Sequence, residues 1–464
     1  MNKLLLLPLL LVFIACSEPK ERDSGAWFGG QIINPTTDHI ILTKNDVVVD
    51  TINLNNENKF LYHLDSVEKG TYNFVHNEYQ IIYLEPGDSL MLYVNTLEFD
   101  ESLAFSGKGA SQNNFLIKMF LHNEEESELM PKYYNLPTEA FIKSIDSLKN
   151  IKTEKLDEYT SKKDVCEDFV TVAKANIDYN DFLKREIYPY AHYGFNMVNA
   201  TDSLPKNYYA FRKEIDYNNT LLQSYYPYYR FMNYHFDYLS FEEYRDQEAF
   251  NRYSYLHNTF KLNLIDEYIT NQFLKNKLLR NAIRLYLIHS KTLDHEADII
   301  ALYKSLNTNP DYAKEIDALA AASIEIMPGK KIPDLKIVDT KNRQYRLRNL
   351  ISKPTVVYFW SPKQVSHHKN VHAKIDELQR KYPEFDFIAV STEKNAELWK
   401  QAIARNSYSA KEYKFSNTKN AIDTLVINSI NKVLIVDSNG IILDNHANLF
   451  HTRFEEQLLG YLNQ

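Results

Sequence analysis

Cysteine is scarce in this chain, because only Cys16 and Cys166 occur among its 464 residues. Basic tracts are also missing, with 61 Asp and Glu against 53 Lys and Arg, so nucleic acid is not an expected partner. The chain contains no Gly-x-Ser-x-Gly, phosphate-binding loop or His-Glu-x-x-His pattern. We therefore predict neither a cofactor nor a bound metal ion.

Long hydrophobic runs are missing as well, except at the start of the chain. Met1–Lys3 carries a positive charge, and Leu4–Ile14 is an apolar run of 11 residues. This run is shorter than the roughly 20 residues of a membrane-spanning helix, so residues 1–15 are predicted to be a signal peptide. The rest of the chain is expected to be soluble.

The end of this segment, Val12-Phe-Ile-Ala-Cys16, resembles a bacterial lipobox. The resemblance implies cleavage before Cys16, acylation of its thiol, and a membrane partner reached through the lipid. Ser17 implies, by the same resemblance, delivery to the outer membrane of the cell envelope, facing either the periplasm or the exterior. An ordinary signal peptide cleaved near Ala15 is the alternative. With Cys16 acylated, Cys166 is the only thiol left, and an exported protein with one thiol forms no internal disulfide.

Composition divides the next part of the chain into a tether and a β-rich block. Residues 16–26 are polar and are predicted to be a lipid-anchored tether. Across residues 27–110, short β-branched and aromatic runs alternate with turn residues, which predicts an antiparallel β-sandwich. This block resembles a β-rich domain that precedes thioredoxin-like domains in bacterial lipoproteins, at Lys69–Tyr72, Leu84–Leu90 and Phe105–Ala110. The resemblance implies no catalytic role.

Residues 111–323 show helical spacing and little glycine, which predicts an all-α region. Leu278–Ile288 is the clearest amphipathic helix, with Leu278, Ala282, Leu285 and Ile288 expected on its inner face. The region also contains a cluster of tyrosines and phenylalanines between Tyr225 and Tyr238, in which Tyr226 and Tyr229 are candidate ligand-binding residues. These rings are either core packing, the interpretation we favour, or the lining of a pocket for a sugar, peptide or aromatic ligand.

Residues 327–464 alternate between strand and helix signals, which predicts an α/β domain. The expected strands include the buried run Thr355–Trp360 and the runs Phe385–Val390, Lys432–Val436 and Ile441–Leu443, with helices after Ser366, around Ala396–Ile403 and at Thr452–Leu462. This order resembles the thioredoxin fold, specifically the TlpA-type branch of exported thioredoxin-like proteins. The resemblance rests on Ile332–Leu335, Val356–Trp360 and Val433–Gly440.

The active-site motif of that family is degenerate in this sequence. Members show Phe-Trp-Ala-x-Trp-Cys-x-x-Cys, and counting from Phe359-Trp360 places the two cysteine positions at Gln364 and His367. Thiol–disulfide exchange needs a thiolate nucleophile and a second, resolving thiol, and neither Gln nor His supplies one. Asn431 also stands where the family has a cis-proline, so a trans peptide bond is expected there. Redox catalysis is therefore not expected.

A histidine cluster follows the degenerate motif. His368 and His372 are four residues apart and are predicted to share one face of the helix after Ser366, beside His367. The spacing fits no recognised metal motif, so a solvated, histidine-rich helix start is the favoured interpretation. Cys166 is expected to be a buried small hydrophobic residue.

The sequence thus predicts a multidomain chain: a β-sandwich, an all-α region and a thioredoxin-like domain. Its leading functional hypothesis is a non-catalytic binding or scaffolding protein of the cell envelope, with a protein or peptide partner at the thioredoxin-like groove near Trp360. One alternative is an enzyme of another class, using the face of His367, His368 and His372 or a tyrosine-lined pocket in residues 180–260. Another is a domain that only docks a partner protein.

Overall fold

A computed structural model describes residues 24–76, 78–194, 204–290, 292, 294–408 and 411–462. The chain divides into two compact units. The first consists of Met1–His192 and Asn219–Phe231, and the second of Tyr193–Asn218 and Met232–Gln464. The predicted lipid-attachment residue Cys16 lies outside the described residues. Within the described residues, no helix combines the length and hydropathy needed to cross a membrane.

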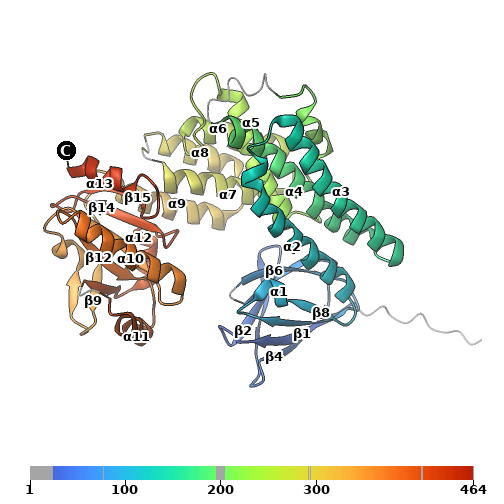
Figure 1. Cartoon of the computed structure of the whole chain (residues 1–464), viewed down its shortest axis with the longest axis horizontal. Coiled ribbons are helices and arrows are strands. Elements are labelled where there is room, and N and C mark those ends of the chain that lie inside the picture. The colour runs from blue at the N-terminus through green and yellow to red at the C-terminus, as the bar shows by residue number, and fades with distance from the viewer. Residues whose placement is uncertain are drawn as a thin grey trace, which may run out of the picture. The chain divides into compact units, whose positions relative to one another are not determined.

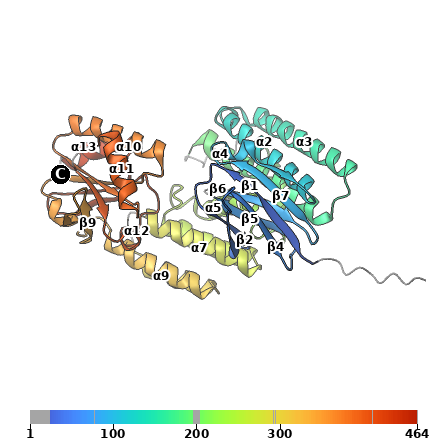
Figure 2. The same ribbon diagram turned by 90° about the horizontal axis from the view of Figure 1, so that it is seen from below.

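The first unit begins with a β-sandwich of two four-stranded sheets, ordered β4-β1-β7-β8 and β3-β2-β5-β6 (Figures 1 and 2). Its strands are β1 (Ala26–Ile33), β2 (His39–Lys44), β3 (Val47–Asn53), β4 (Lys59–Leu64), β5 (Gly70–His76), β6 (Glu78–Leu84), β7 (Ser89–Asn95) and β8 (Ala104–Ser106). The expected sandwich is confirmed, but the expectation of a wholly antiparallel one is wrong. The first strand pairs with β7 in parallel, from Trp27 opposite Ser89 to Ile33 opposite Asn95.

The sandwich core forms because alternate residues of each strand face inward. Phe28 and Ile32 of β1 are fully buried, as is Phe74 of β5 on the opposite sheet. The short helix α1 (Phe99–Ser102) adds Phe99, whose ring stacks on Phe74 with centroids 6.2 Å apart. Apolar residues of both sheets thus share one core.

Long helices complete the first unit: α2 (Ala110–Tyr133), α3 (Thr138–Lys162) and α4 (Glu167–Tyr193). Asn113 of α2 ties this helix to the sandwich, because its side chain accepts from the backbone N of Tyr83 and donates to the Tyr83 carbonyl, both at 2.8 Å. The helical region expected at residues 111–323 is divided between the two units, since its remaining helices belong mainly to the second.

The helices that follow are η3 (Tyr208–Glu214), α5 (Tyr226–Tyr244), α6 (Tyr255–Tyr268), α7 (Gln272–His289), α8 (Glu296–Leu306) and α9 (Pro310–Glu325). The predicted amphipathic helix is present as α7. Leu278, Ala282 and Ile288 are buried as expected, whereas Leu285 is only half-buried. Ile283 and Leu287 are buried as well, so the apolar face of α7 is wider than the spacing indicated.

The second unit ends in a seven-stranded sheet ordered β10-β9-β13-β12-β11-β14-β15. Its strands are β9 (Lys336–Asp339), β10 (Gln344–Arg346), β11 (Thr355–Trp360), β12 (Asp386–Ser391), β13 (Glu412–Phe415), β14 (Lys432–Val436) and β15 (Ile442–Asn448). Its helices are η4 (Leu347–Leu350), α10 (Val365–Lys381), α11 (Ala396–Asn406), α12 (Thr418–Thr424) and α13 (Phe454–Leu462). Three of these elements, β13, α12 and the short helix η4, were not predicted from the sequence.

The central strand β11 divides this region into two cores because successive side chains point to opposite faces. Val356, Tyr358 and Trp360 pack with α10, α11 and α13, whereas Val357 and Phe359 pack on the face covered by α12. Figure 2 shows α10 and α13 on one side of the sheet and α12 on the other. All six residues of β11 are buried, which agrees with the uninterrupted apolar run in the sequence.

Candidate functional site

The loop between β11 and α10 is the place where the sequence locates the degenerate motif. Gln364 is the N-cap residue of α10 but makes no side-chain capping hydrogen bond, and it is exposed to solvent. Its backbone N donates to the Ser361 carbonyl at 3.1 Å, which closes the turn. The next residue, Val365, has 55% of its surface exposed. Gln364 and Val365 therefore face solvent where the chain leaves the central strand.

The structure brings His367 and Asn431 together, although 63 intervening residues separate them in the sequence. Burial lowers the pKa of His367, and a smaller interaction with the Asn431 side chain opposes this shift. The His367 ring also contacts the Phe450 ring, with centroids 6.3 Å apart. The described residues contain no cis peptide bond, so the expected trans bond before Asn431 is present.

The prediction of a solvated histidine-rich helix start is wrong for two of the three histidines. His368 is 3% exposed and His372 is 6% exposed. Tyr408, which follows α11, covers them: its hydroxyl lies 2.6 Å from His368 Nδ1, and its ring stacks on the His372 ring with centroids 3.6 Å apart. The helical spacing that places both histidines on one face therefore directs them into the core.

Glu412, on β13, is the partner of His372. Its Oε1 lies 2.9 Å from His372 Nε2, and its Oε2 accepts a hydrogen bond from Trp360 Nε1 at 2.9 Å. The intervening strand β12 has the small residue Ala389 in register between Tyr358 and Glu412, which leaves room above the sheet. Burial raises the pKa of Glu412, and the interactions with His372 and Trp360 only partly offset this effect.

The hydrogen bonds determine how many protons this buried pair holds. His372 Nδ1 lies 2.6 Å from the His368 carbonyl oxygen, which can only accept, so Nδ1 carries a hydrogen. The contact between His372 Nε2 and Glu412 Oε1 then needs one further proton, on either atom. The pair is closed off from solvent, since the side chains are 7% and 2% exposed. This arrangement fixes α10 to β13 and offers no open position for a substrate.

Sequence reasoning missed Glu412 because β13 gives a weak signal. Its sequence, Glu-Tyr-Lys-Phe, alternates charged and aromatic residues, and both charged residues, Glu412 and Lys414, are buried together with Phe415. The alternation itself is the period-2 pattern of a strand and could have predicted the element. The expectation of a metal-free site also stays a prediction, although the described residues form no group of three metal-ligating side chains.

The remaining candidate ligand-binding residues are divided between the two units, with Trp360 in the second and Tyr226 and Tyr229 in the first. Trp360 is fully buried, so its ring contacts the core and not an open groove, contrary to the expectation. Tyr226 is 52% exposed and Tyr229 is half-buried. Their neighbour Tyr228 is fully buried and packs edge-on against Tyr179, with centroids 4.8 Å apart. Core packing, the favoured interpretation of the tyrosine cluster, therefore holds for Tyr228.

Cys166 is not the buried hydrophobic residue that was expected. It is half-buried, and its Sγ donates a hydrogen bond to Glu85 Oε1 at 2.7 Å. The Tyr83 hydroxyl lies 3.1 Å from the same sulfur. The thiol thus joins the start of α4 to the end of β6 within the first unit.

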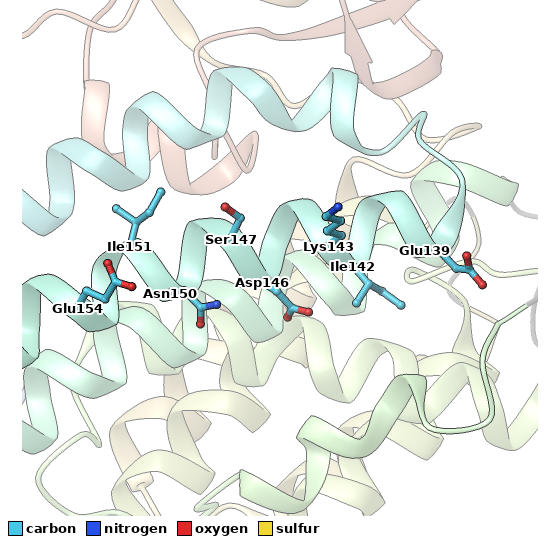
Figure 3. A pocket seen from close by; sticks show the side chains of 8 residues that line it. All are labelled: Glu139, Ile142, Lys143, Asp146, Ser147, Asn150, Ile151 and Glu154. Carbon is cyan, nitrogen blue, oxygen red and sulfur yellow. The ribbon is translucent and has the colours of Figure 1, made fainter.

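A hollow on α3 is the other notable feature of the first unit (Figure 3). Figure 3 shows that all eight lining side chains come from this single helix, at Glu139, Ile142, Lys143, Asp146, Ser147, Asn150, Ile151 and Glu154. Asp146 accepts from Arg185 Nη2 at 2.6 Å, so it is already paired within the protein. Side chains of one exposed helix face do not converge on a common point, and the hollow has no evident chemistry.

Comparison with known proteins identifies the fold of the C-terminal region. Residues 352–442 match the model of a protein family described as thioredoxin-like. Among solved structures, the chain is similar to the thioredoxin domain of a thiol-disulfide oxidoreductase from Bacteroides vulgatus (18% identity, 29% of this chain and 98% of that chain, TM-score 0.27). It is also similar to a thiol:disulfide interchange protein from a Bacteroides species (19% identity, 30% and 93%, TM-score 0.26). No curated protein matches the chain. The family match covers β11–β14 and the start of β15, so the chain has a C-terminal thioredoxin-like domain.

Proposed function

We propose that the thioredoxin-like domain does not catalyse thiol–disulfide exchange and serves instead as a binding module for a protein or peptide. The observation that carries this proposal is the chemistry of the loop after β11, where Gln364 and His367 occupy the cysteine positions of the TlpA-type motif. An amide and an imidazole cannot form the mixed disulfide through which exchange proceeds. Cys166, the cysteine not proposed for lipid attachment, belongs to the first unit and is hydrogen-bonded to Glu85.

An insulin-reduction assay with a dithiol reductant tests the redox part. The wild-type chain should reduce insulin no faster than the reductant alone. The double variant Gln364→Cys/His367→Cys is the matched control, because it restores both thiols at the start of α10 and should raise the rate above background. If the wild-type protein reduces insulin above background and a Cys166→Ser variant does so equally well, the proposal is contradicted.

The binding surface we propose is an exposed apolar patch beside the former active site. We define the loop patch as Val365, His367 and Phe450. Val365 is 55% and Phe450 46% exposed, and the Phe450 ring touches the His367 ring. Exposed apolar side chains gathered at one place are typical of interaction surfaces. In the TlpA-type proteins that the sequence resembles, this edge contacts extended polypeptide, which supports a polypeptide partner here.

The loop patch is tested with a permanently unfolded polypeptide, reduced and carboxymethylated lactalbumin, as the probe. Phe450→Ser and Val365→Ser should each weaken its binding, because each removes apolar contact area at the patch. Leu459→Ser on α13 is the matched control, since Leu459 is similarly exposed (48%) and lies outside the patch. Equal binding by all three variants would exclude the patch as the docking surface.

We also propose that the protein is anchored to the cell envelope through Cys16, at the outer membrane. The lipobox-like Val12–Cys16 supports this proposal. Growth with labelled palmitate should label the wild-type protein, whereas Cys16→Ser should remain unlabelled. Labelling of the Cys16→Ser variant would refute lipidation at this residue.

The alternative of an enzyme that uses the histidine face receives less support. His368 and His372 are buried and hydrogen-bonded, so they present no open ligand positions. A role of the thioredoxin-like domain as a docking module alone is tested by deletion. Deletion of residues 327–464 should remove partner proteins from a pull-down, and unchanged partners would exclude every binding role of the domain.

A further inference from the structure

A pocket of about 510 Å³ lies among the ends of helices in the second unit. It is formed by the segment before α6, the C-terminal end of α7 and the segment that leads into α8. These three helices contact one another, and Figure 1 shows them side by side. The volume falls within the roughly 300–1,000 Å³ typical of small-molecule sites. Nothing in the thioredoxin-like fold requires this pocket.

Two stacked pairs of rings form part of its wall. The Tyr253 ring stacks on the His289 ring, with centroids 4.6 Å apart and planes 24° apart. The Tyr255 ring stacks on the His295 ring, with centroids 4.4 Å apart and planes 28° apart. An edge-to-face contact with His446 at 4.1 Å also holds His289 in place. Flat ring surfaces are therefore held on both the α7 side and the α8 side of the pocket.

The rest of the lining is dense in hydrogen-bonding groups. Of the lining residues that the structure describes, only Leu256 is aliphatic, and the others carry a hydroxyl, amide, carboxylate or imidazole group: Glu248, Asn251, Tyr253, Ser254, Tyr255, Tyr286, His289, Ser290, Thr292, Asp294 and His295. Some of these groups already pair with one another, as Ser254 does with Glu248 and Ser290 with the Thr292 carbonyl. The carboxylate and amide groups keep further hydrogen-bonding capacity, which a purely apolar ligand would not use. The lining thus favours a ligand that bears many hydroxyl groups and also has a face that can pack on rings.

The charges of the described lining residues are unfavourable for anionic ligands. Glu248 and Asp294 are acidic, and none of the lining residues that the structure describes is a lysine or an arginine. Burial lowers the pKa of His289, and the positive charges of Lys432 and Arg284 lower it further, so this imidazole is neutral at physiological pH. A phosphate or carboxylate would meet two like charges without a cation to pair with. Nucleotides, phosphosugars and uronic acids are therefore disfavoured.

We propose that this pocket binds a neutral saccharide of one or two sugar units. The C–H face of a sugar ring would pack on Tyr253 or Tyr255, and its hydroxyls would exchange hydrogen bonds with groups such as Glu248 and Asn251. This site is separate from the loop patch, and its occupancy does not depend on whether the thioredoxin-like domain is redox-active.

The experiment is titration of the full-length protein with the neutral disaccharides maltose, cellobiose and lactose, followed by ligand-observed NMR. At least one of them should bind, and Tyr253→Leu and Tyr255→Leu should each weaken that binding by about fivefold to tenfold, as expected for the loss of a stacking contact. Tyr226→Leu is the matched control, because it makes the same change at an exposed tyrosine outside the pocket and should bind like the wild type. Tyr255→Phe replaces the leucine variant as a test if that variant fails to fold. It keeps the aromatic ring, so it should retain the stacking contact with the sugar.

Three results would overturn the proposal. The first is the absence of binding by all three disaccharides at millimolar concentration. The second is binding that Tyr226→Leu weakens as much as Tyr253→Leu does. The third is a preference for glucuronic acid or for choline over the neutral sugars, which would assign the pocket to an anion or a cation. The insulin-reduction result leaves all three readouts unaffected, so the two proposals fail independently.

Discussion

Replacing Glu412 tests how the core between α10 and β13 is held together. The Glu412 side chain is 2% exposed and accepts a hydrogen bond from Trp360 Nε1. Glu412→Leu keeps a similar volume but removes both oxygens. It leaves the Trp360 N–H and His372 Nε2 buried without partners, and each such loss costs about 1–3 kcal/mol. We expect Glu412→Leu to lower the free energy of unfolding of the second unit by about 3 kcal/mol.

Glu412→Gln is the matched comparison, because its amide keeps one donor and one acceptor in the same place. Its carbonyl can accept from Trp360 Nε1, and its NH₂ can donate to His372 Nε2, which lacks a hydrogen when Nδ1 carries one. The glutamine variant should therefore lose less than about 1 kcal/mol. The difference between the two variants measures the hydrogen bonds rather than the packing.

Tryptophan fluorescence during chemical denaturation reports the outcome. The chain has three tryptophans, and Trp360 and Trp399 belong to the second unit, while Trp27 lies in the β-sandwich. A Trp27→Phe background therefore restricts the signal to the second unit. A glutamine variant as unstable as the leucine variant would refute the reasoning, because it would show that a charge on Glu412 is essential. A leucine variant as stable as the wild type would refute the importance of the pair.

The same pair predicts a pH dependence with a definite sign. Burial raises the pKa of Glu412 in the folded protein above its value in the unfolded chain. Over the interval between the two pKa values, the folded state holds a proton that the unfolded state has lost, so stability decreases as pH rises. The stability that Glu412 contributes is fully present below its pKa in the unfolded chain and is lost as pH rises through its pKa in the folded protein. Glu412→Gln should abolish this component, and equal slopes for both proteins would contradict it.

Three further outcomes are expected from buried groups elsewhere. Lys432→Met should destabilise the second unit by about 2 kcal/mol, because the Lys432 ammonium donates at 2.9 Å to two carbonyls at the end of α12. An unchanged denaturation midpoint would contradict this loss of stability. Burial and the neighbouring Lys184 lower the pKa of Lys152 to about 8. The stability of the first unit should therefore rise with pH from about 8 towards the pKa of lysine in the unfolded chain. This pH dependence should vanish in Lys152→Met but persist in the control Lys174→Met, which changes an exposed lysine. Gly107→Ala should lower the melting temperature of the sandwich, measured by circular dichroism. The φ angle of Gly107 is +85°, and a Cβ there would lie 2.0 Å from the Ser89 carbonyl oxygen. An unchanged melting temperature would refute this expectation.

Much of the architecture could be predicted because periodic patterns report local structure directly. The run Thr355–Trp360 predicted β11 residue for residue, and Lys432–Val436 did the same for β14. Patterns fail where polar residues are buried. The strand β13 was missed because Glu412 and Lys414 face the interior, where burial is supported by partners that are distant in sequence. The parallel pairing of β1 with β7 was missed for a different reason, since strand patterning carries no information about direction.

For the candidate site, the sequence by itself determined which residues stand at the loop after β11 and the start of α10. Gln364 and His367 are there, and neither carries the thiol that exchange requires. Only the tertiary structure decided what the neighbouring histidines do. Helical spacing places His368 and His372 on one face of α10. Whether that face is exposed to water or buried against other side chains depends on residues 36 to 40 positions away in the sequence. These residues are Tyr408 and Glu412, which contact the two histidines. Burial and pairing are properties of the assembled fold, so this closed histidine–glutamate pair could not be derived from local pattern.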